Sequence, residues 1–305
     1  MMSSPNVCAD DKRIFCRIAD HEVALSFAPN AVADAALLAS LGPFVHEPTA
    51  GDTTALLHLR VDNAMKRDPE AKLLRSFDTG NGDTEVSCLP DGGYQYVISN
   101  LRGEACCLLE CHRRFTDCCC ALRGDQVMRQ FGLNNALMMA FAFATSYHAT
   151  TLIHASCIKQ GCWGYPFIAQ SGTGKSTHTG LWMRCIEGCE LLNDDNPIVR
   201  IVDGQPVIYG SPWSGKTPCY RNISARLGAV TRIERSADNY CERLSPVQAF
   251  ASLLPACSSM IWDHEIHDNL CNTITRIIET TPCFTMHCRP DDEAARISHQ
   301  TIKRD

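Results

Sequence analysis

The sequence predicts an α/β protein, α+β overall, in which a β-rich N-terminal region of residues 1–124 precedes a mixed domain of residues 125–305. Short apolar stretches separated by turn signals fill the first region, as in a meander of antiparallel strands. Beyond residue 125, strand-like and helix-like stretches alternate, which is typical of a sheet covered by helices. A chain of 305 residues is long enough for one large domain or two modest ones.

The composition is that of a globular protein, with 45% hydrophobic and 20% charged residues. A formal net charge of −6 disfavours general binding to nucleic acid or to an anionic membrane, so neither is expected as a partner. Met1–Asp20 lacks the sustained apolar core of a signal peptide. The most apolar helical stretch, Leu133–Tyr147, is too short to cross a bilayer. These features predict a cytoplasmic protein.

The chain contains nineteen cysteines, an unusually high number. A disulfide-rich secreted scaffold is usually much shorter and carries a signal peptide, so reduced thiols are expected. The sequence contains no Cys-x-x-Cys pair and completes no recognised four-ligand zinc pattern. We therefore interpret the cysteines as small apolar residues of strands and helices.

Within the N-terminal region, apolar and β-branched residues bounded by turns predict strands. Turn signals occur at Asp78–Asp83 and Pro90–Gly93, and a short helix is expected at Ala31–Leu41, before Gly42-Pro43. The expected strands are Ile14–Ala19, Thr54–Val61, Tyr94–Ile98, Ala105–Cys111 and, joined to the last by a hairpin, Cys118–Leu122.

The C-terminal domain is expected to begin with a helix at about Gln126–Tyr147. Asp203-Gly204 is a strong signal for a two-residue hairpin, and Ser245 before Pro246 predicts a helix start. The expected strands are Thr151–Ile158, Tyr165–Ile168, Cys189–Leu192, Pro197–Val202, Gln205–Tyr209, Leu227–Arg232 and Cys283–Cys288. The expected helices are Thr177–Met183, Pro246–Leu254, Met260–Ile278 and a terminal helix from Pro290-Asp291-Asp292 to Thr301.

The most informative stretch is Ala169–Thr177, which reads Ala-Gln-Ser-Gly-Thr-Gly-Lys-Ser-Thr. It lies between an expected strand and an expected helix, the context of a Walker A phosphate-binding loop, and departs from that pattern only where Ala169 replaces glycine. Backbone N–H groups of such a loop surround phosphate oxygens, Lys175 reaches the β- and γ-phosphates, and the Ser176 hydroxyl ligates Mg²⁺. The alternative is a loop that is rich in Gly and Ser by chance. The glycine spacing, the lysine, the serine and the flanking elements all favour a phosphate-binding loop instead. The candidate cofactor-binding residues are Ser171, Gly172, Thr173, Gly174, Lys175, Ser176 and Thr177.

A second polar cluster, Asn193–Asn196, directly follows the strand expected at Cys189–Leu192. Strand, loop, helix and strand form a βαβ unit whose two strand ends can share one edge of a sheet, where ligands of open α/β sheets bind. One of Asp194 and Asp195 is then expected to hold Mg²⁺ and the other to accept the proton of an attacking hydroxyl, and their assignment stays open. A solvated acidic turn is the alternative. The candidate catalytic residues are Asp194, Asp195 and Lys175, and the candidate metal ligands are Ser176 and Asp195.

A third stretch, Gly210–Asn222, is rich in glycine and proline and is expected to be a loop. Its cations Lys216 and Arg221 are candidate ligands for a substrate anion or a transferring phosphoryl group, with an ordinary surface loop as the alternative.

Outside these stretches, each of four further side chains allows two interpretations of its role. His154 either contacts the phosphate pocket as a substrate-binding residue or is a hydrogen-bonded core histidine. His178 is expected to pack or to face solvent. Arg232 and Arg235 are anion ligands or partners in salt bridges.

Taken together, His154, the segment Ser171–Ser176 and the pair Asp194-Asp195 resemble the HPr kinase/phosphorylase (HPr serine kinase-related) family within the phosphoenolpyruvate-carboxykinase-like group of P-loop proteins. The resemblance covers about residues 150–205 well and the C-terminal third in outline. It implies a P-loop nucleotide-binding core of the phosphoenolpyruvate-carboxykinase-like type, ATP and Mg²⁺ as cofactors, and frequent assembly into homo-oligomers. Leu227–Val230 stands where that family carries a Glu-x-Arg-Gly-x-Gly segment, so an acceptor other than HPr is expected.

The leading hypothesis is therefore an ATP-dependent, HPr kinase-like phosphotransferase that phosphorylates a hydroxyl. The acceptor would be a protein or peptide serine or a small molecule. Two alternatives are a nucleotide-responsive binding protein without phosphoryl transfer and an NTPase that uses water as acceptor. The aspartate pair favours catalysis over binding alone, and the sequence leaves the acceptor unidentified.

Overall fold

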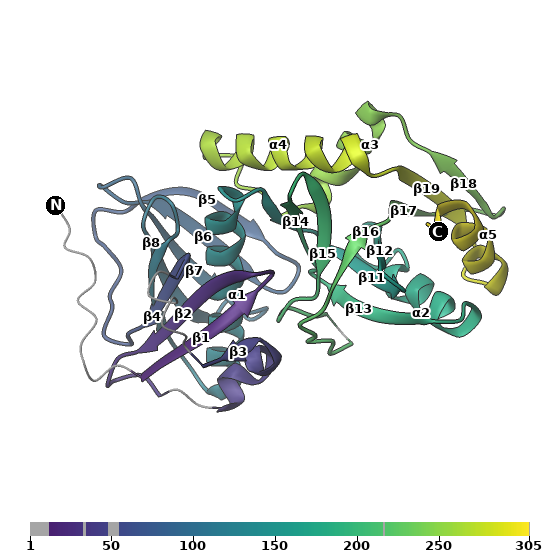
Figure 1. Ribbon diagram of the computed structural model, residues 1–305. Helices are drawn as coiled ribbons and strands as arrows, with labels where there is room; N and C mark the ends of the chain where they lie inside the picture. Colours follow the sequence, from purple (N-terminus) through teal and green to yellow (C-terminus); the bar gives the residue numbers. More distant parts are fainter. Residues whose placement is uncertain (1–11, 33–34, 48–54, 216, 305) are drawn as a thin grey trace. The chain divides into compact units, whose positions relative to one another are not determined.

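The computed structural model describes residues 12–32, 35–47, 55–215 and 217–304 (Figure 1). The chain divides into two compact units, one ending at Ala144 and the other beginning at Thr145. Each unit contains one large mixed sheet and few helices, so the architecture is mixed α/β. The division falls near the end of the long helix after residue 125, because that helix packs on the first sheet.

The first unit is built on a nine-stranded sheet with the order β3-β1-β2-β4-β9-β8-β7-β6-β5. Strands β5 to β9 form the antiparallel meander that the sequence predicts. By contrast, β4 runs parallel to both of its neighbours, β2 and β9. The strands are β1 (Lys12–Ile18), β2 (His21–Phe27), β3 (Val45–His46), β4 (Leu57–Val61), β5 (Lys72–Asp78), β6 (Asp83–Cys88), β7 (Tyr94–Ser99), β8 (Ala105–Cys111) and β9 (Asp117–Leu122).

Helix α1 (Gln126–Ser146) packs on this sheet. The ring of Phe143 meets that of Phe115 edge to face, with ring centroids 5.1 Å apart. Gly132 lets the helix approach β8 closely, because a Cβ at that position would lie only 2.8 Å from the carbonyl oxygen of Cys106. The helix therefore belongs to the core of the first unit.

Several elements of the first unit differ from the expectation. Strands β2, β3, β5 and β6 were not predicted. Strand β3 has only two residues, β2 is a nearly continuous buried run, and β5 is exposed along almost all of its length, so neither β2 nor β5 alternates clearly. The helix expected at Ala31–Leu41 is instead the 3₁₀ helix η1 (Ala35–Phe44), which contains Pro43, a residue without an N–H donor. The strand expected from Thr54 begins at Leu57, and residue 54 lies outside the described residues.

The second unit contains a ten-stranded mixed sheet with the main order β10-β14-β15-β16-β12-β17-β19-β18. Strand β11 pairs with β12 and with β13, which completes the sheet. The strands are β10 (Thr150–Leu152), β11 (Ala155–Gln160), β12 (Trp163–Ile168), β13 (Cys189–Asp195), β14 (Ile198–Val202), β15 (Gln205–Tyr209), β16 (Ser224–Leu227), β17 (Val230–Arg235), β18 (Tyr240–Arg243) and β19 (Cys283–Cys288).

Helices of the second unit contribute to two separate cores. Trp182 and Phe167 belong to one core, together with apolar residues of α5. The adjacent Ile168 belongs to the other core, with Leu270 and Ile274 of α4, as the alternation of side chains along a strand requires. Helices α2 and α5 lie next to each other (Figure 1). The helices are α2 (Lys175–Cys185), α3 (Pro246–Leu253), the short η2 (Leu254–Ala256), α4 (His264–Thr280) and α5 (Asp292–Ile302).

The expected elements of the second unit are mostly present, with four differences. The strand expected at Thr151–Ile158 is two strands, β10 and β11, separated by Ile153 and His154. The strand expected at Leu227–Arg232 is two strands, β16 and β17, separated by Gly228 and Ala229. Helix α4 begins at His264, after the cap Asp263, rather than near residue 260. Strand β18 was not predicted. Ser245 caps α3 in a capping box, with Pro246 in its first turn, as predicted.

Eighteen of the nineteen cysteines lie in the described residues, and none of these eighteen forms a disulfide. The same residues contain no group of three or more His, Cys, Asp or Glu side chains placed to share a metal ion. No helix in the described part of the chain has the length and apolarity needed to span a membrane.

Candidate functional site

Three segments that are distant in sequence meet at one edge of the second sheet. Strand β11 lies between β12 and β13 and is antiparallel to both, so β12 and β13 run parallel to each other. Ala155 at the start of β11 pairs with Ile168 at the end of β12 and with Asp195 at the end of β13. This register brings His154, the glycine-rich segment after Ile168 and the aspartate pair to the same edge, as the βαβ pattern predicted.

The glycine-rich loop that follows β12 uses two glycines for their backbone conformation. Gly172 has φ of 77° and Gly174 has φ of 126°, in the region that side chains rarely adopt. Gly174 is also the N-cap of α2, and this cap makes no side-chain hydrogen bond. The caps of α3, α4 and α5 all do, through Ser or Asp side chains. The N-terminal N–H groups of α2 are therefore available to an anion.

Arg235, at the end of β17, holds this loop from its carbonyl side. Its Nη2 donates to the carbonyl of Gly172 at 2.6 Å and its Nε to that of Thr173 at 3.3 Å. The sequence predicted that Arg235 is an anion ligand or a salt-bridge partner, and neither prediction included this contact with loop carbonyls. Arg232, on the same strand, instead pairs with Glu234 at 3.1 Å.

Lys175, the first residue of α2, begins a chain of polar contacts. Its Nζ lies 2.8 Å from Nε2 of His154 and donates to the carbonyl of Ala169 at 3.2 Å. Nδ1 of His154 lies 3.1 Å from Oδ1 of Asp195. Because an ammonium group only donates, Nε2 accepts and the ring carries its proton on Nδ1, facing Asp195. Burial lowers the pKa of Lys175, and the nearby carboxylates of Asp195 and Asp194 partly offset this.

Ser176 contacts the other carboxylate of the pair. Its hydroxyl donates to Oδ1 of Asp194 at 2.9 Å, and Asp194 is almost fully buried. The candidate metal ligands from the sequence were Ser176 and Asp195, but the side chain next to Ser176 is that of Asp194. A hydroxyl and a carboxylate are hard oxygen ligands of the kind that Mg²⁺ prefers, so Ser176 and Asp194 suit such an ion.

The end of β13 is held in place by Asn193, which is fully buried. Its Nδ2 lies within hydrogen-bond distance of the carbonyls of Trp213 at 3.1 Å and Cys219 at 3.3 Å, and of the Ser211 hydroxyl at 3.2 Å. Its Oδ1 accepts from the backbone N–H of Asn196 at 3.0 Å. Sequence reasoning treated Asn193 only as part of a polar cluster, although a single Asn ending an apolar strand is a sign of such a backbone contact.

Asp195 adopts an unusual backbone conformation, with φ of 127°. A non-glycine residue in this region is strained, and such strain gathers at functional sites. The strand end is fixed on one side by the loop after residue 210, because the N–H of Gly215 donates to the carbonyl of Asp194 at 2.7 Å. A Cβ on Gly215 would lie 3.2 Å from the Cβ of Asp195, so a glycine suits this approach.

The other candidate residues lie elsewhere or outside the described chain. Arg221 donates to Oε2 of Glu190 at 2.6 Å and to the carbonyl of Leu191, toward the beginning of β13 and away from the aspartate pair. Arg221 lowers the pKa of Glu190, with help from Lys159. Lys216 lies outside the described residues. His178 is buried in the core between α2 and α5 and lies 3.0 Å from the hydroxyl of Ser298.

Comparisons with known proteins add little to what the geometry of this site shows. The chain matches no protein-family model and no curated protein. Among solved structures, the HPr(Ser) kinase/phosphatase from Coxiella burnetii is matched at 9% sequence identity with a TM-score of 0.29, over 49% of this chain and 91% of that chain. The interpretation of the site therefore depends on its own residues.

Proposed function

We propose that the second unit is an ATP- and Mg²⁺-dependent phosphotransferase that transfers the γ-phosphoryl group to a hydroxyl, on a protein or peptide serine or on a small molecule. The observation that carries this proposal is the convergence of an uncapped glycine-rich helix start, Lys175, the Ser176–Asp194 contact and the His154–Asp195 contact at one sheet edge. Phosphoryl transfer needs mainly charge neutralisation and positioning, and these groups offer both.

Each residue receives a role that follows from its contacts. The N–H groups at the start of α2 and the Lys175 ammonium bind phosphate oxygens, and Lys175 turns from His154 toward them. Ser176 and Asp194 hold Mg²⁺, which neutralises phosphate charge when it is bound. Asp195 accepts the proton of the attacking hydroxyl, while His154, hydrogen-bonded to one of its oxygens, orients the carboxylate. Arg235 fixes the loop from outside.

This assignment makes a choice that the sequence left open, and it differs from the candidate metal ligands named there. Asp195, taken there as a metal ligand, becomes the base, because its Oδ1 lies against the His154 ring and its Oδ2 accepts from Asn196 at 2.8 Å. Asp194 becomes the metal ligand, because Ser176 donates to it. Arg221 has no part in the proposed mechanism, since Glu190 occupies its guanidinium.

Equilibrium binding of ATP, measured by calorimetry with and without Mg²⁺, tests the proposed site. The intact protein is expected to bind ATP more tightly with Mg²⁺, and Lys175→Ala to weaken binding at least about tenfold, because a charged contact is lost. Lys159→Ala is the matched control, since Lys159 pairs with Glu190 away from the site. Equal affinity of all three proteins, or no binding by the intact protein, would refute the proposal.

A further inference from the structure

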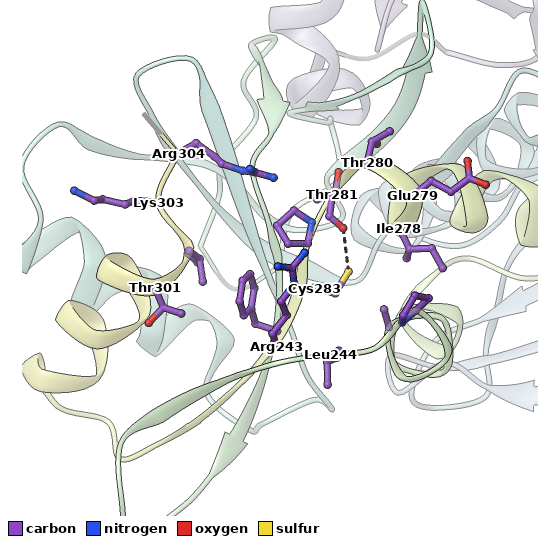
Figure 2. A pocket seen from close by; sticks show the side chains of 15 residues that line it. Arg243, Leu244, Ile278, Glu279, Thr280, Thr281, Cys283, Thr301, Lys303 and Arg304 are labelled. Atoms are coloured by element: carbon purple, nitrogen blue, oxygen red, sulfur yellow. Dashed lines mark hydrogen bonds between the residues drawn. The ribbon is translucent and has the colours of Figure 1, made fainter.

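A second site lies at the opposite end of the strands from the glycine-rich loop. At the loop end, β17 and β19 pair Arg235 with Cys288, and at the far end they pair Val230 with Cys283. A cavity of about 430 Å³ opens beside Cys283, a volume within the range of small-molecule pockets. The ends of α4, α5 and β18 and the beginnings of α3 and β19 form its walls (Figure 2).

The wall of this cavity carries an excess of positive charge. Its described residues include three cations, Arg243, Lys303 and Arg304, and one carboxylate, that of Glu279. In Figure 2 the guanidinium groups of Arg243 and Arg304 point toward the middle of the cavity, whereas the side chains of Lys303 and Glu279 extend away from it. Among the described residues that line it, the cavity therefore presents two inward guanidinium groups, and the one carboxylate, that of Glu279, points away from them.

Arg304 is held in place for such a role. Its Nε donates to the carbonyl of Gly228 at 3.1 Å, and its guanidinium carbon lies 6.0 Å from the ring centroid of Trp163. The backbone N–H of Arg304 also donates to the hydroxyl of Tyr165 at 2.9 Å. One edge of the guanidinium is thus fixed by the protein, which lowers the entropy lost when the remaining N–H groups bind a ligand.

Arg243 is fixed through its strand. It is the last residue of β18 and pairs with Phe284 of β19, whose side chain also lines the cavity. Cations near helix C-termini often serve only to offset carbonyl groups. Here the guanidinium of Arg304 instead donates to the carbonyl of Gly228, which belongs to neither α4 nor α5.

The remaining wall combines apolar side chains with three threonines, Thr280, Thr281 and Thr301. Leu244, Ile278, Pro282 and Phe284 line the cavity beside the charged groups. Guanidinium groups bind carboxylate and phosphate oxygens with paired hydrogen bonds. The four apolar side chains suit the uncharged part of a ligand, and the threonine hydroxyls suit its polar groups. We propose that this cavity binds a small organic anion, with its carboxylate or phosphate held by Arg243 and Arg304. The proposal is independent of the nucleotide site.

Calorimetric titration tests this proposal in a Lys175→Ala background, which removes the proposed phosphate contact at the other site. The probes are glycerol 3-phosphate, succinate and inorganic phosphate. We expect one of the two organic anions to bind, and more tightly than inorganic phosphate. The phosphate and carboxylate probes then distinguish the two head groups. Arg243→Gln and Arg304→Gln are each expected to weaken that binding at least about tenfold.

Lys303→Gln is the matched control, because it removes the same charge from a side chain that points out of the cavity (Figure 2). It is expected to change affinity less than about twofold, since the interaction of exposed charges is screened. Absence of binding by all three probes, unchanged binding by Arg243→Gln, or an equal loss in Lys303→Gln would overturn the proposal. Arg243→Gln keeps the test valid if Arg304→Gln destabilises the fold.

Discussion

At the scale of single residues, Asp194 and Asp195 differ sharply although they are adjacent. Asp194 is buried and accepts a hydrogen bond from Ser176, whereas Asp195 is partly exposed and contacts His154. Consecutive residues of a strand point to opposite faces, so the two carboxylates reach different partners at the end of β13, where Asp195 has a strained φ. Substitutions of the two residues are therefore expected to impair different steps.

Asp195→Asn is expected to lower turnover by about 10²–10⁴-fold, the usual contribution of a general base, with little change in affinity for MgATP. Asp194→Asn is expected to weaken the dependence of ATP binding on Mg²⁺, because it removes a proposed oxygen ligand. Turnover at saturating ATP and ATP affinity across a Mg²⁺ titration measure the two effects. Exchange of the two phenotypes would show that the assignment is reversed.

At the scale of elements, the antiparallel strand β11 between β12 and β13 determines where the site forms. Its register places His154 between the glycine-rich loop and the aspartate pair, and β17 adds Arg235 beside the loop. Arg235 donates hydrogen bonds to the carbonyls of Gly172 and Thr173 and so holds these carbonyls on the outside of the glycine-rich loop. Strand β17 therefore stabilises the loop that follows β12.

Arg235→Gln is expected to weaken ATP affinity about tenfold, because hydrogen bonds from a charged donor to the loop are lost. Its thermal stability is expected to change little, since the residue is exposed. Arg232→Gln, on the same strand but paired with Glu234, is the control and is expected to bind ATP as the intact protein does. Calorimetry on both variants makes the comparison. Equal ATP affinities of Arg235→Gln and Arg232→Gln would show that Arg235 does not contribute to nucleotide binding.

The contact between α2 and α5 contains a titratable group in a dry environment. Burial lowers the pKa of His178 from 6.5 to about 4. Ser298 of α5 satisfies two side chains of α2, since its hydroxyl lies 3.0 Å from Nε2 of His178 and accepts from Nε1 of Trp182 at 2.8 Å. His178 is thus a core histidine, one of the two roles expected for it.

His178 makes stability depend on pH in one direction. Between pH 6.5 and about 4 the unfolded chain binds a proton that the folded protein does not, so the free energy of unfolding falls as the pH falls. Protonation of His178 alone is expected to lower the free energy of unfolding by about 2 kcal/mol between pH 7 and pH 5. Urea unfolding at both pH values, beside His178→Gln, measures the effect. An identical pH dependence in the variant would contradict the buried neutral state.

The elements around the site could be predicted because their signals are local. The hairpin at Asp203-Gly204, the cap at Ser245 and the polar end of β13 each depend on a few adjacent residues. The contact of Arg235 with the loop and the different partners of the two carboxylates could not be predicted, because both depend on which strands lie side by side and in which register. Arg221 carried the charge of an anion ligand, but Glu190 on a neighbouring strand pairs with it.

At the scale of the whole molecule, neither unit depends on covalent cross-links among its described residues. The buried cysteines act as small apolar side chains, and burial raises the pKa of Cys157 and of the strand residues Cys16 and Cys283, which keeps these thiols protonated. Cys118 and Cys120 point into the core while Cys119 between them is partly exposed, the alternation expected of consecutive residues in a strand.

Thermal unfolding is therefore expected to give the same midpoint with and without a strong reductant, because no disulfide among the described residues is there to be lost. Scanning calorimetry under both conditions tests this. Loss of a native disulfide typically costs about 2–5 kcal/mol, so a clear drop of the midpoint in reductant would show that one exists.

Transfer of label from γ-labelled ATP tests the central claim most directly. The intact protein is incubated with Mg²⁺, a cell extract and a pool of small metabolites, beside Lys175→Ala and Asp195→Asn. We expect label on a protein band or a metabolite with the intact protein only, which would also identify the acceptor class. ATP binding without label transfer would contradict a kinase. It would favour a nucleotide-responsive binding protein, or an NTPase if labelled phosphate is released.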